Sequence, residues 1–582
     1  MRNWTAWSLL LSFGMLLRYA TLSRADNPIV QTIYTADPAP LVHDDRLYIF
    51  TGHDEDGWTT YNMLDWRVFS TTDMQNWQHY PVPMSLDTFG WANAQAWAGQ
   101  VVARNGQFYF YVPVRNAATN GMAIGVGVSD NVTGPYQDAI GGPLLENNEI
   151  DPTVFVNDDG QAYMYWGNPN LWYVTLNSDM VSYTGEINQV ELTVEGFGER
   201  LDNPERPTTF EEGPWLEKRD ELYYLIYAAN CCSEDIQYSI GPTATGPWTY
   251  RGVIMPAEGA SFTNHPGVVQ YRNASYFTYH NGALPGGSGY TRPVAVERFD
   301  YNPDGTIPEL QMTTEGPARI SGLDPYVRQE AETIAWGDGV ETEDCSEGTL
   351  NIRAVSNGAY IKVGGVTFND GAAGFIARVA SVHDGCTIEL HLDSPTGPLV
   401  GTCSVPVTGD RQSWETQDHG ILRGVIREGG SGLCSCQPTS PNKTRPTKTS
   451  RISNHRFQIA LNSFIITIPV CTLTAVLLGL VFRNQVGHGD TPFEHLRGNL
   501  TQGESDVYYI NMNSSVILFV ASWASSLAPM LLGFILALAS FPIARQLFED
   551  ARGGRIDRLL TPYQLALILK FLDGSAISGI WN

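Results

Sequence analysis

The sequence predicts an all-β protein: a five-bladed β-propeller, followed by a β-sandwich of the jelly-roll type and then by two transmembrane helices. Three observations support this prediction. Aromatic residues make up 11% of the chain, which also contains 57 glycines and 34 prolines, a composition typical of short strands joined by tight turns. An aromatic strand motif recurs five times in the first half. Two long uncharged segments lie near the end of the chain.

The recurring motif consists of turn residues followed by a strand with a tyrosine at a fixed place. These tyrosines are Tyr48, Tyr109, Tyr163, Tyr223 and Tyr276, and successive ones are 61, 54, 60 and 53 residues apart. A repeat of that length accommodates four short strands, so we predict one propeller blade for each repeat. A β-sandwich whose hairpins are similar by coincidence is the alternative.

A second set of residues lies in phase with this repeat, eleven or twelve positions before each tyrosine. The set is Asp37, Trp97, Asp151, Glu212 and His265. Equivalent positions of a propeller are related by rotation, so a position at the start of each innermost strand brings all five side chains to one mouth. Carboxylates gathered there repel one another and lose solvation. Proteins therefore retain such a cluster only where it has a function. Glycosidic bond cleavage needs such carboxylates with separated pKa values.

The same register distinguishes two neighbouring carboxylates, Glu211 and Glu212. Only Glu212 stands eleven residues before its blade's tyrosine, Tyr223. Because side chains alternate along a strand, we predict that Glu211 points away from the axis.

Residues 28–320 resemble glycoside hydrolase family 43 through "YTADPAPLVHDDRLYIFTGHDE", "EIDPTVFVNDDGQAYMYWG" and "EEGPWLEKRDELYYLIYAA". The resemblance implies a five-bladed propeller that cleaves glycosides with inversion of the anomeric carbon. It implies Asp37 as the general base, Glu212 as the general acid, and Asp151 as the carboxylate that orients the acid and tunes its pKa. A neighbouring negative charge would raise the pKa of Glu212 and keep it protonated near the working pH.

The resemblance also suggests four further residues of the pocket. Trp97 would form an apolar wall against the sugar, Arg292 would contact the substrate, and His53 would line the pocket. His265 would contact the substrate and a bound calcium ion near the axis. A surface ion pair is the alternative for Arg292. No cofactor is required by the predicted reaction, and calcium would be structural.

The expected substrate is a plant cell-wall polysaccharide. The segment "MLDWRVFSTTDMQNW" is most similar to the sequences of arabinofuranosidase and xylosidase members of the family. We therefore expect cleavage of α-L-arabinofuranosyl or β-D-xylosyl linkages in arabinoxylan and related hemicellulose. An endo-arabinanase and a catalytically silent sugar-binding propeller remain as alternatives. The net charge of −26 argues against a nucleic-acid partner, because phosphate binding needs a basic surface.

Residues 329–420 alternate apolar strands with Gly/Asp turns, which predicts a β-sandwich. They resemble a family 6 carbohydrate-binding module. By that resemblance Tyr360 and Trp414 would stack against a sugar, and Glu330 and Glu332 would bind a structural calcium ion. The alternative for the two aromatic residues is a place in the core.

The usual last strand of such a module is missing from the pattern. The sandwich is therefore predicted to be truncated or to take its final strand from elsewhere. Residues 421–456, which are basic and rich in Pro, Ser and Thr, are predicted to form a linker.

The two ends of the chain place the linker between the sandwich and the membrane segment on opposite sides of a membrane. Residues 1–25 predict a secretory signal peptide, and eight cysteines in a secreted chain favour disulfides. Residues 457–582 predict a membrane segment with helices near 457–482 and 515–543. Basic residues flank both helices, which places those flanks in the cytoplasm by the positive-inside rule, whereas the signal peptide places the linker outside.

Two hypotheses resolve this conflict. Either the protein is a glycosidase tethered to the membrane against the charge rule, or the reading frame of a secreted enzyme has been joined to part of an unrelated membrane protein. The tail loosely resembles fungal multi-pass membrane proteins of unknown function. We expect a secreted protein, which is membrane-anchored if the C-terminal helices are genuine.

Overall fold

The computed structural model describes residues 26–438, except residues 202, 370, 384–385 and 421–431. The chain divides into two compact units, 1–441 and 442–582, and all described residues belong to the first. The predicted signal peptide and both predicted membrane helices lie outside the described residues. Within the described part of the chain, no helix is long and apolar enough to cross a membrane.

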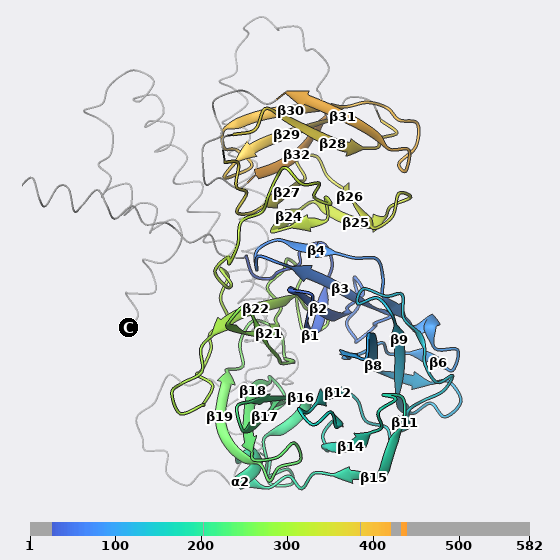
Figure 1. The fold of residues 1–582 in the computed structure, drawn as a ribbon, viewed down its shortest axis with the longest axis vertical. Helices are drawn as coiled ribbons and strands as arrows, with labels where there is room; N and C mark the ends of the chain where they lie inside the picture. The colour runs from blue at the N-terminus through green and yellow to red at the C-terminus, as the bar shows by residue number, and fades with distance from the viewer. Residues whose placement is uncertain (1–25, 202, 370, 384–385, 421–431, 439–582) are drawn as a thin grey trace, which may run out of the picture. The chain divides into compact units, whose positions relative to one another are not determined.

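Five antiparallel sheets arranged in a ring form the first domain (Figure 1). The first sheet contains β1 (Thr35–His43), β2 (Arg46–His53), β3 (Asp65–Thr71), β4 (Trp77–His79) and, beside β3, β5 (Met84–Ser85). A 3₁₀ turn, η1 (Leu86–Thr88), follows β5. The second sheet contains β6 (Ala92–Ala94), β7 (Gln100–Arg104), β8 (Gln107–Asn116), β9 (Met122–Ser129), β10 (Gln137–Asp138) and β11 (Leu145–Glu146).

The other three sheets are simple meanders. The third contains β12 (Thr153–Val156), β13 (Ala162–Trp166), β14 (Trp172–Leu176) and β15 (Tyr183–Gln189). A short helix, α2 (Val194–Phe197), precedes the fourth, which contains β16 (Phe210–Arg219), β17 (Leu222–Ala229), β18 (Asp235–Gly241) and β19 (Thr249–Met255). The fifth contains β20 (Gly267–Tyr271), β21 (Ala274–His280) and β22 (Val294–Phe299).

The N-terminal segment of the domain closes the ring against the three-stranded fifth sheet. The backbone N–H of Ile29 donates to the carbonyl of Val294 at 2.9 Å, and that of Thr35 donates to the carbonyl of Arg292 at 2.7 Å. The outer side of β22 is thereby paired, which protects a sheet edge that would otherwise be open.

The repeat predicted from the sequence is confirmed. Each repeat tyrosine lies on the second strand of a blade, namely on β2, β8, β13, β17 and β21. The in-phase residues lie within the first strands β1 and β16, or two to three residues before β7, β12 and β20. The five-bladed propeller is therefore confirmed, and the alternative sandwich for this region is wrong.

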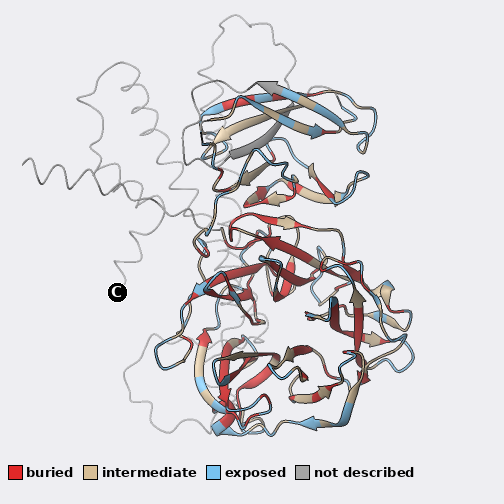
Figure 2. Ribbon diagram, viewed as in Figure 1, coloured by how far each residue is buried: buried red, intermediate tan, exposed pale blue. Residues whose placement is uncertain are grey.

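Large buried side chains fill the space between the blades. Phe110 of the second blade contacts Phe50 and Trp66 of the first, with ring centroids 5.4 and 5.7 Å apart. Aromatic side chains bury much area each, and edge-to-face contacts add to their stability. Strands β8, β17 and β21 are almost continuously buried, and Figure 2 shows the propeller strands as mostly buried.

The second domain is a β-sandwich. Its larger sheet has the order β24-β27-β32-β29-β30, formed by β24 (Trp336–Asp338), β27 (Tyr360–Val363), β32 (Gly432–Pro438), β29 (Cys386–Leu392) and β30 (Leu399–Val405). Two smaller sheets pair β25 (Val340–Asp344) with β26 (Leu350–Ala354), and β28 (Gly374–Val379) with β31 (Glu415–Gly420). A short strand, β23 (Thr333–Ile334), pairs with β4.

Strand β32 corrects part of the linker prediction. Residues 432–438 lie within the predicted linker 421–456, yet they form a strand in the middle of the larger sheet, paired with both β27 and β29. The sequence "GLCSCQP" has turn-like composition, and two neighbouring strands impose the extended backbone despite that local preference. The sandwich thus takes a strand from beyond residue 420.

The described cysteines form one disulfide, between the neighbours Cys231 and Cys232. Within the described part of the chain, Cys345, Cys386 and Cys403 are free thiols.

Candidate active site

The structure brings the five in-phase residues to one end of the propeller axis. Nδ1 of His265 lies 4.0 Å from Oδ1 of Asp37, and the backbone N–H of Gly213, next to Glu212, donates to Oδ2 of Asp151 at 3.1 Å. The ring of Trp97 lies 6.0 Å from that of Tyr61, which also contacts Arg292. The predicted convergence at one mouth is therefore observed.

Local backbone geometry aims the two aspartates. Asp37 has a φ of 54° and Asp151 a φ of 60°, in the left-handed region that costs free energy for most residues and is best tolerated by Asp, Asn and Gly. Strand β1 shifts register between Ala36 and Ala39, and β16 shifts on both sides of Glu212. Such bulges redirect side chains and are frequent beside active sites.

Asp37 is held as a carboxylate by Arg292. Nη1 of Arg292 lies 3.0 Å from Oδ1 of Asp37, while Nε and Nη2 bind the two oxygens of Asp54 at 2.9 and 2.8 Å. Burial alone would raise the pKa of Asp37, but the charge of Arg292 holds it well below its usual range. Arg292 is only 4% exposed, so the alternative of a surface ion pair is wrong.

His280 fixes the backbone of Asp37. The N–H of Asp37 donates to Nδ1 of His280 at 3.2 Å, and Nε2 of His280 donates to the carbonyl of Thr263 at 2.9 Å. These two bonds define a neutral imidazole, in agreement with a pKa that burial lowers. Burial also lowers the pKa of His265, to about 4, so both histidines are neutral at ordinary pH.

Asp151 and Glu212 have pKa values shifted in the opposite direction to that of Asp37. Burial and then the charge of Glu212 raise the pKa of Asp151 well above its usual value. Burial and then the charge of Asp37 raise the pKa of Glu212 to about 7, although a hydrogen bond from Nδ2 of Asn168 to Oε2 of Glu212 opposes the rise. One mouth thus contains an ionised carboxylate and a carboxylic acid.

Glu211 has a different environment from its neighbour. Glu211 is 7% exposed. Its carboxylate binds Arg200 at 2.8 Å and Arg206 at 2.9 Å, and both arginines lie on the segment before β16. As strand alternation predicts, the two glutamates have separate partners. Through these two ion pairs, Glu211 attaches the segment before β16 to the start of that strand.

Tyr61 joins the guanidinium of Arg292 to a cluster of partly buried aromatic rings. Carbon Cζ of Arg292 lies 5.2 Å from the ring of Tyr61, which contacts Trp97 at 6.0 Å, Tyr290 at 4.9 Å and Phe262 at 6.4 Å. Such rings bind the apolar faces of sugars. Of these four, only Trp97 was predicted from the sequence.

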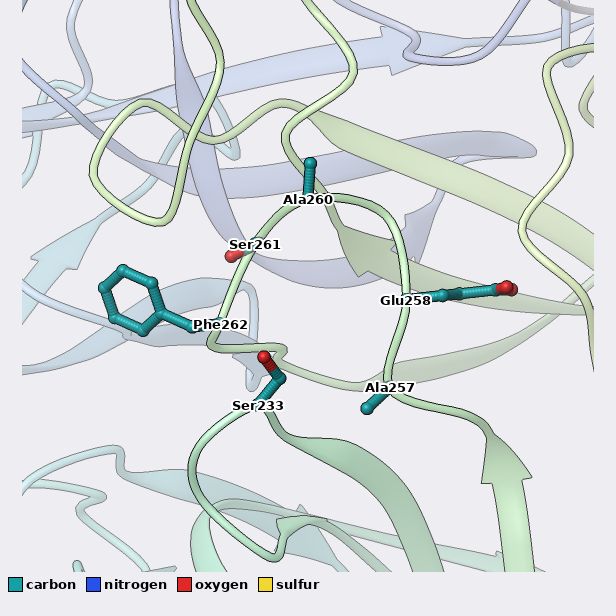
Figure 3. Close-up of a pocket in the computed structure, with 6 residues that line it drawn as sticks. All are labelled: Ser233, Ala257, Glu258, Ala260, Ser261 and Phe262. Carbon is teal, nitrogen blue, oxygen red and sulfur yellow. The ribbon is translucent and has the colours of Figure 1, made fainter. Parts of the chain in front are cut away.

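A cavity of about 250 Å³ lies between the β17–β18 and β19–β20 loops, and Phe262 is one of its lining residues. Figure 3 shows its lining, in which the ring of Phe262 and the carboxylate of Glu258 extend to opposite sides. The other lining side chains are small: Ser233, Ala257, Ala260 and Ser261.

His53 lies in a charged cluster of its own. Its Nδ1 is 3.0 Å from Asp65, 3.1 Å from Nη2 of Arg67 and 3.6 Å from Glu55. These contacts attach His53 to the start of β3. Its predicted role in the pocket stays a prediction.

The predicted calcium contact of His265 also stays a prediction. Calcium prefers oxygen ligands, and the carboxylate nearest to His265, that of Asp37, already binds Arg292. This arrangement supplies few free oxygens.

Glu332 in the sandwich fits a cation better. It is 1% exposed, and neither carboxylate oxygen has a hydrogen-bond partner, although Thr349 and the backbone of Leu350 lie near. Its predicted companion Glu330 binds Arg328 at 3.0 Å instead.

The two aromatic residues predicted to stack on a sugar belong to different parts of the sandwich. Tyr360 begins β27, while Trp414 precedes β31 and donates from Nε1 to Oε1 of Gln412 at 3.2 Å. Among the described residues, no ring contact joins them. Their sugar-binding role stays a prediction.

Sequence reasoning missed Asp54, Asn168 and His280. Each ends or follows the second strand of a blade, four to six residues after its repeat tyrosine. A search of the polar residues four to six positions past each tyrosine, rather than at one fixed register, would have found all three.

Fold and site together define a propeller whose mouth is equipped for acid–base cleavage of glycosides. Known proteins agree with this class. Residues 25–307 match the family model "Glycosyl hydrolases family 43", and residues 330–423 match "Carbohydrate binding module (family 6)".

Two bacterial relatives are both named arabinoxylan arabinofuranohydrolase. The protein of Paenibacillus polymyxa is 32% identical over 485 residues, covering 70% of this chain and 73% of the relative. The protein of Bacillus subtilis (strain 168) is 32% identical over 456 residues, covering 67% and 85%. A crystal structure of a family 43 arabinoxylan arabinofuranohydrolase from Bacillus subtilis, in complex with cellotetraose, superimposes with a TM-score of 0.61 at 29% identity, covering 72% of this chain and 95% of the other.

This chain belongs to glycosyl hydrolases family 43 and carries a family 6 carbohydrate-binding module. It is a glycosidase.

Proposed function

We propose that the protein removes α-L-arabinofuranosyl or β-D-xylosyl units from arabinoxylan and related hemicellulose, with inversion at the anomeric carbon. The observation that carries the proposal is the opposite shift of two pKa values in one mouth, down for Asp37 and up to about 7 for Glu212. The relatives named arabinoxylan arabinofuranohydrolase support this substrate class.

In the proposed reaction Asp37 is the general base and Glu212 the general acid. A water molecule attacks the anomeric carbon while Asp37 takes its proton, and the glycosidic C–O bond breaks as Glu212 gives its proton to the leaving oxygen. Arg292 keeps Asp37 ionised, and His280 fixes its backbone. Asp151 orients Glu212 through the N–H of Gly213.

Tyr61 and the aromatic side chains in contact with it would hold the sugar that is cleaved. Trp97 and Tyr61 offer apolar surface, and Arg292 lies beside them, positioned by Asp54. Flat rings bind the C–H faces of sugars, while the charged groups bind hydroxyls.

Product analysis on arabinoxylan tests this function. The first product detected by NMR should be free arabinose or xylose in the anomeric form opposite to that of the substrate. Release of the retained anomer would contradict inversion, and oligosaccharides of arabinan as the main product would favour the endo-arabinanase alternative. Binding without any cleavage would support the silent propeller.

We also propose that Glu332 holds a structural calcium ion in the sandwich, because its two buried oxygens have no hydrogen-bond partner and hard cations prefer such ligands. Finally, we propose that the enzyme acts outside the cell, where its polysaccharide substrate is found. Fractionating a culture into medium, membranes and cytosol tests that location and distinguishes a secreted from an anchored form.

A further inference from the structure

Asn168, on the loop after β13, contacts the side chain of Glu212 directly. Its Nδ2 donates a hydrogen bond to Oε2 of Glu212. An amide N–H is a donor that a carboxyl oxygen accepts whether the group is ionised or protonated. The contact therefore persists while Glu212 holds its proton.

The loop that carries Asn168 is fixed by its backbone. Gly167 has a φ of 141°, and a Cβ atom there would lie 1.7 Å from the carbonyl oxygen of Asn170, so only glycine fits. The N–H of Gly167 donates to the carbonyl of Ile150 at 2.8 Å. The start of the loop thus has one conformation.

Glu149 anchors the rest of the loop. It is 8% exposed and accepts three N–H groups, from the backbone of Asn168 at 2.8 Å and from the side chains of Asn170 and Trp172 at 3.2 Å each. Hydrogen bonds to a buried carboxylate are stronger than those between neutral groups. Glu149 therefore fixes where the amide of Asn168 points.

The third blade consequently holds Glu212 at two places. Asp151 accepts the N–H of Gly213, which positions the backbone, and Asn168 binds Oε2, which positions the carboxyl group. Glu149 and Asp151 flank Ile150 on the same short segment, so both contacts have one support.

We propose that Asn168 is a positioning residue which, fixed by Glu149, makes Oε2 the carbonyl oxygen of the acid and leaves Oε1 to carry the proton toward the leaving group. The proposal rests on the proposed role of Glu212 as the acid. A protonated carboxyl group has one carbonyl oxygen and one hydroxyl oxygen. The oxygen that accepts the N–H of Asn168, Oε2, is the carbonyl oxygen.

Removing the N–H of Asn168 should raise the pKa of Glu212. Burial and the charge of Asp37 raise the pKa of Glu212, whereas Asn168 lowers it by stabilising the ionised form. The other charged or titratable groups that act on this mouth are Asp151, Glu211, Glu234, Arg292 and Tyr61. Without Asn168 the pKa of Glu212 rises further, and more of Glu212 is protonated at a given pH.

Two variants and two substrates test the proposal. Asn168→Ala removes the donor, and Asn168→Asp keeps the size but adds a like charge beside Glu212. We expect kcat/KM on arabinoxylan to fall about 100-fold for Asn168→Ala, as for other small misplacements of reacting groups. A dinitrophenyl glycoside, whose leaving group needs no proton, should lose less than about threefold, since acid catalysis contributes little there. The alkaline limb of the pH profile should move to higher pH in both variants.

Asn177→Ala is the matched control, because Asn177 lies on the same blade and bonds Ser182 and Thr184 instead. It should leave both rates and the alkaline limb unchanged. Equal losses on both substrates with an unmoved limb in either Asn168 variant would overturn the positioning role. If Glu212→Gln itself lowers both substrates equally, the assignment of the acid fails, whatever Asn168 does. Asn168→Asp preserves the volume of the loop, so it gives an answer even if the alanine variant does not fold.

Discussion

The mouth of the propeller and the start of the sandwich domain each contain a buried glutamate whose pKa is raised to about 7. Burial is the main cause for both Glu212 and Glu332. Their neighbours differ. Glu212 accepts a hydrogen bond from Asn168 and shares its mouth with ionised Asp37, whereas the oxygens of Glu332 have no hydrogen-bond partner and its companion Glu330 binds an arginine.

A raised pKa by itself therefore reports burial. Glu217, on the same strand as Glu212, also has a pKa raised to about 7 by burial, and it bonds the hydroxyl of Tyr301. Acid–base chemistry requires, in addition, a second group whose pKa is shifted the other way. Within the described residues, we find that pairing at the propeller mouth, in Asp37 and Glu212.

The largest expected effect comes from removing the two raised-pKa glutamates in turn. Glu212→Gln should lower kcat/KM on arabinoxylan by about 10²–10⁴-fold, the range that general acid catalysis contributes. Glu332→Gln should leave kcat/KM within about twofold, because the sandwich carries no part of the proposed reaction. Steady-state rates on arabinoxylan measure both. A comparable loss for Glu332→Gln would remove the distinction between the two regions.

The pH profile gives the next effect. Glu212 must be protonated to act, and its protonated form is lost as pH rises through about 7. We expect kcat/KM to fall about tenfold per pH unit above that value, since each unit removes nine-tenths of the acid form. Because Arg292 holds the pKa of Asp37 far below its usual range, activity should not decline near pH 4, where an ordinary aspartate titrates. Initial rates across pH 3–9 test this, and a level profile from pH 6 to 9 would contradict it.

The propeller could be predicted from sequence because its chemistry follows a repeat. One register placed Asp37, Asp151 and Glu212 together, and the structure agrees. The register did not reveal Asp54 or Asn168, since they follow the second strands at slightly different distances, four to six residues past the tyrosine. Loops of unequal length shift such residues along the chain while leaving them close in space.

The sandwich was harder to predict because no repeat fixes its register. Strand β32 was assigned to a linker, since "GLCSCQP" has few strand-forming residues and its pairing partners lie 40 to 80 residues earlier. Tyr360 and Trp414 were paired by resemblance, yet Tyr360 begins β27 of the larger sheet whereas Trp414 precedes β31 of a smaller one. Contacts that are distant in sequence decide this domain, and local pattern says little about them.

Removing calcium should affect only the sandwich. If Glu332 binds the ion, a chelator should lower the melting temperature on the order of 5 °C, and added calcium should restore it, because an ion that binds only the folded state stabilises it. Glu332→Gln should melt at one temperature with or without calcium. Differential scanning calorimetry measures both proteins. A chelator effect that survives in the variant would place the ion elsewhere.

The smallest expected effect concerns sugar binding by the sandwich. Trp414→Ala should weaken retention on insoluble xylan about tenfold, the loss expected when one stacking contact of about 1.4 kcal/mol is removed, and hydrolysis of a small chromogenic glycoside should stay unchanged. Tyr360→Ala tests whether the second ring binds the same sugar. Because Tyr360 begins β27 whereas Trp414 precedes β31, which pairs in another sheet, we expect their effects to add in the double variant, as for independent sites. A double variant no weaker than Trp414→Ala alone would instead show that one sugar contacts both rings, and would make the resemblance a better guide than the sheet assignment.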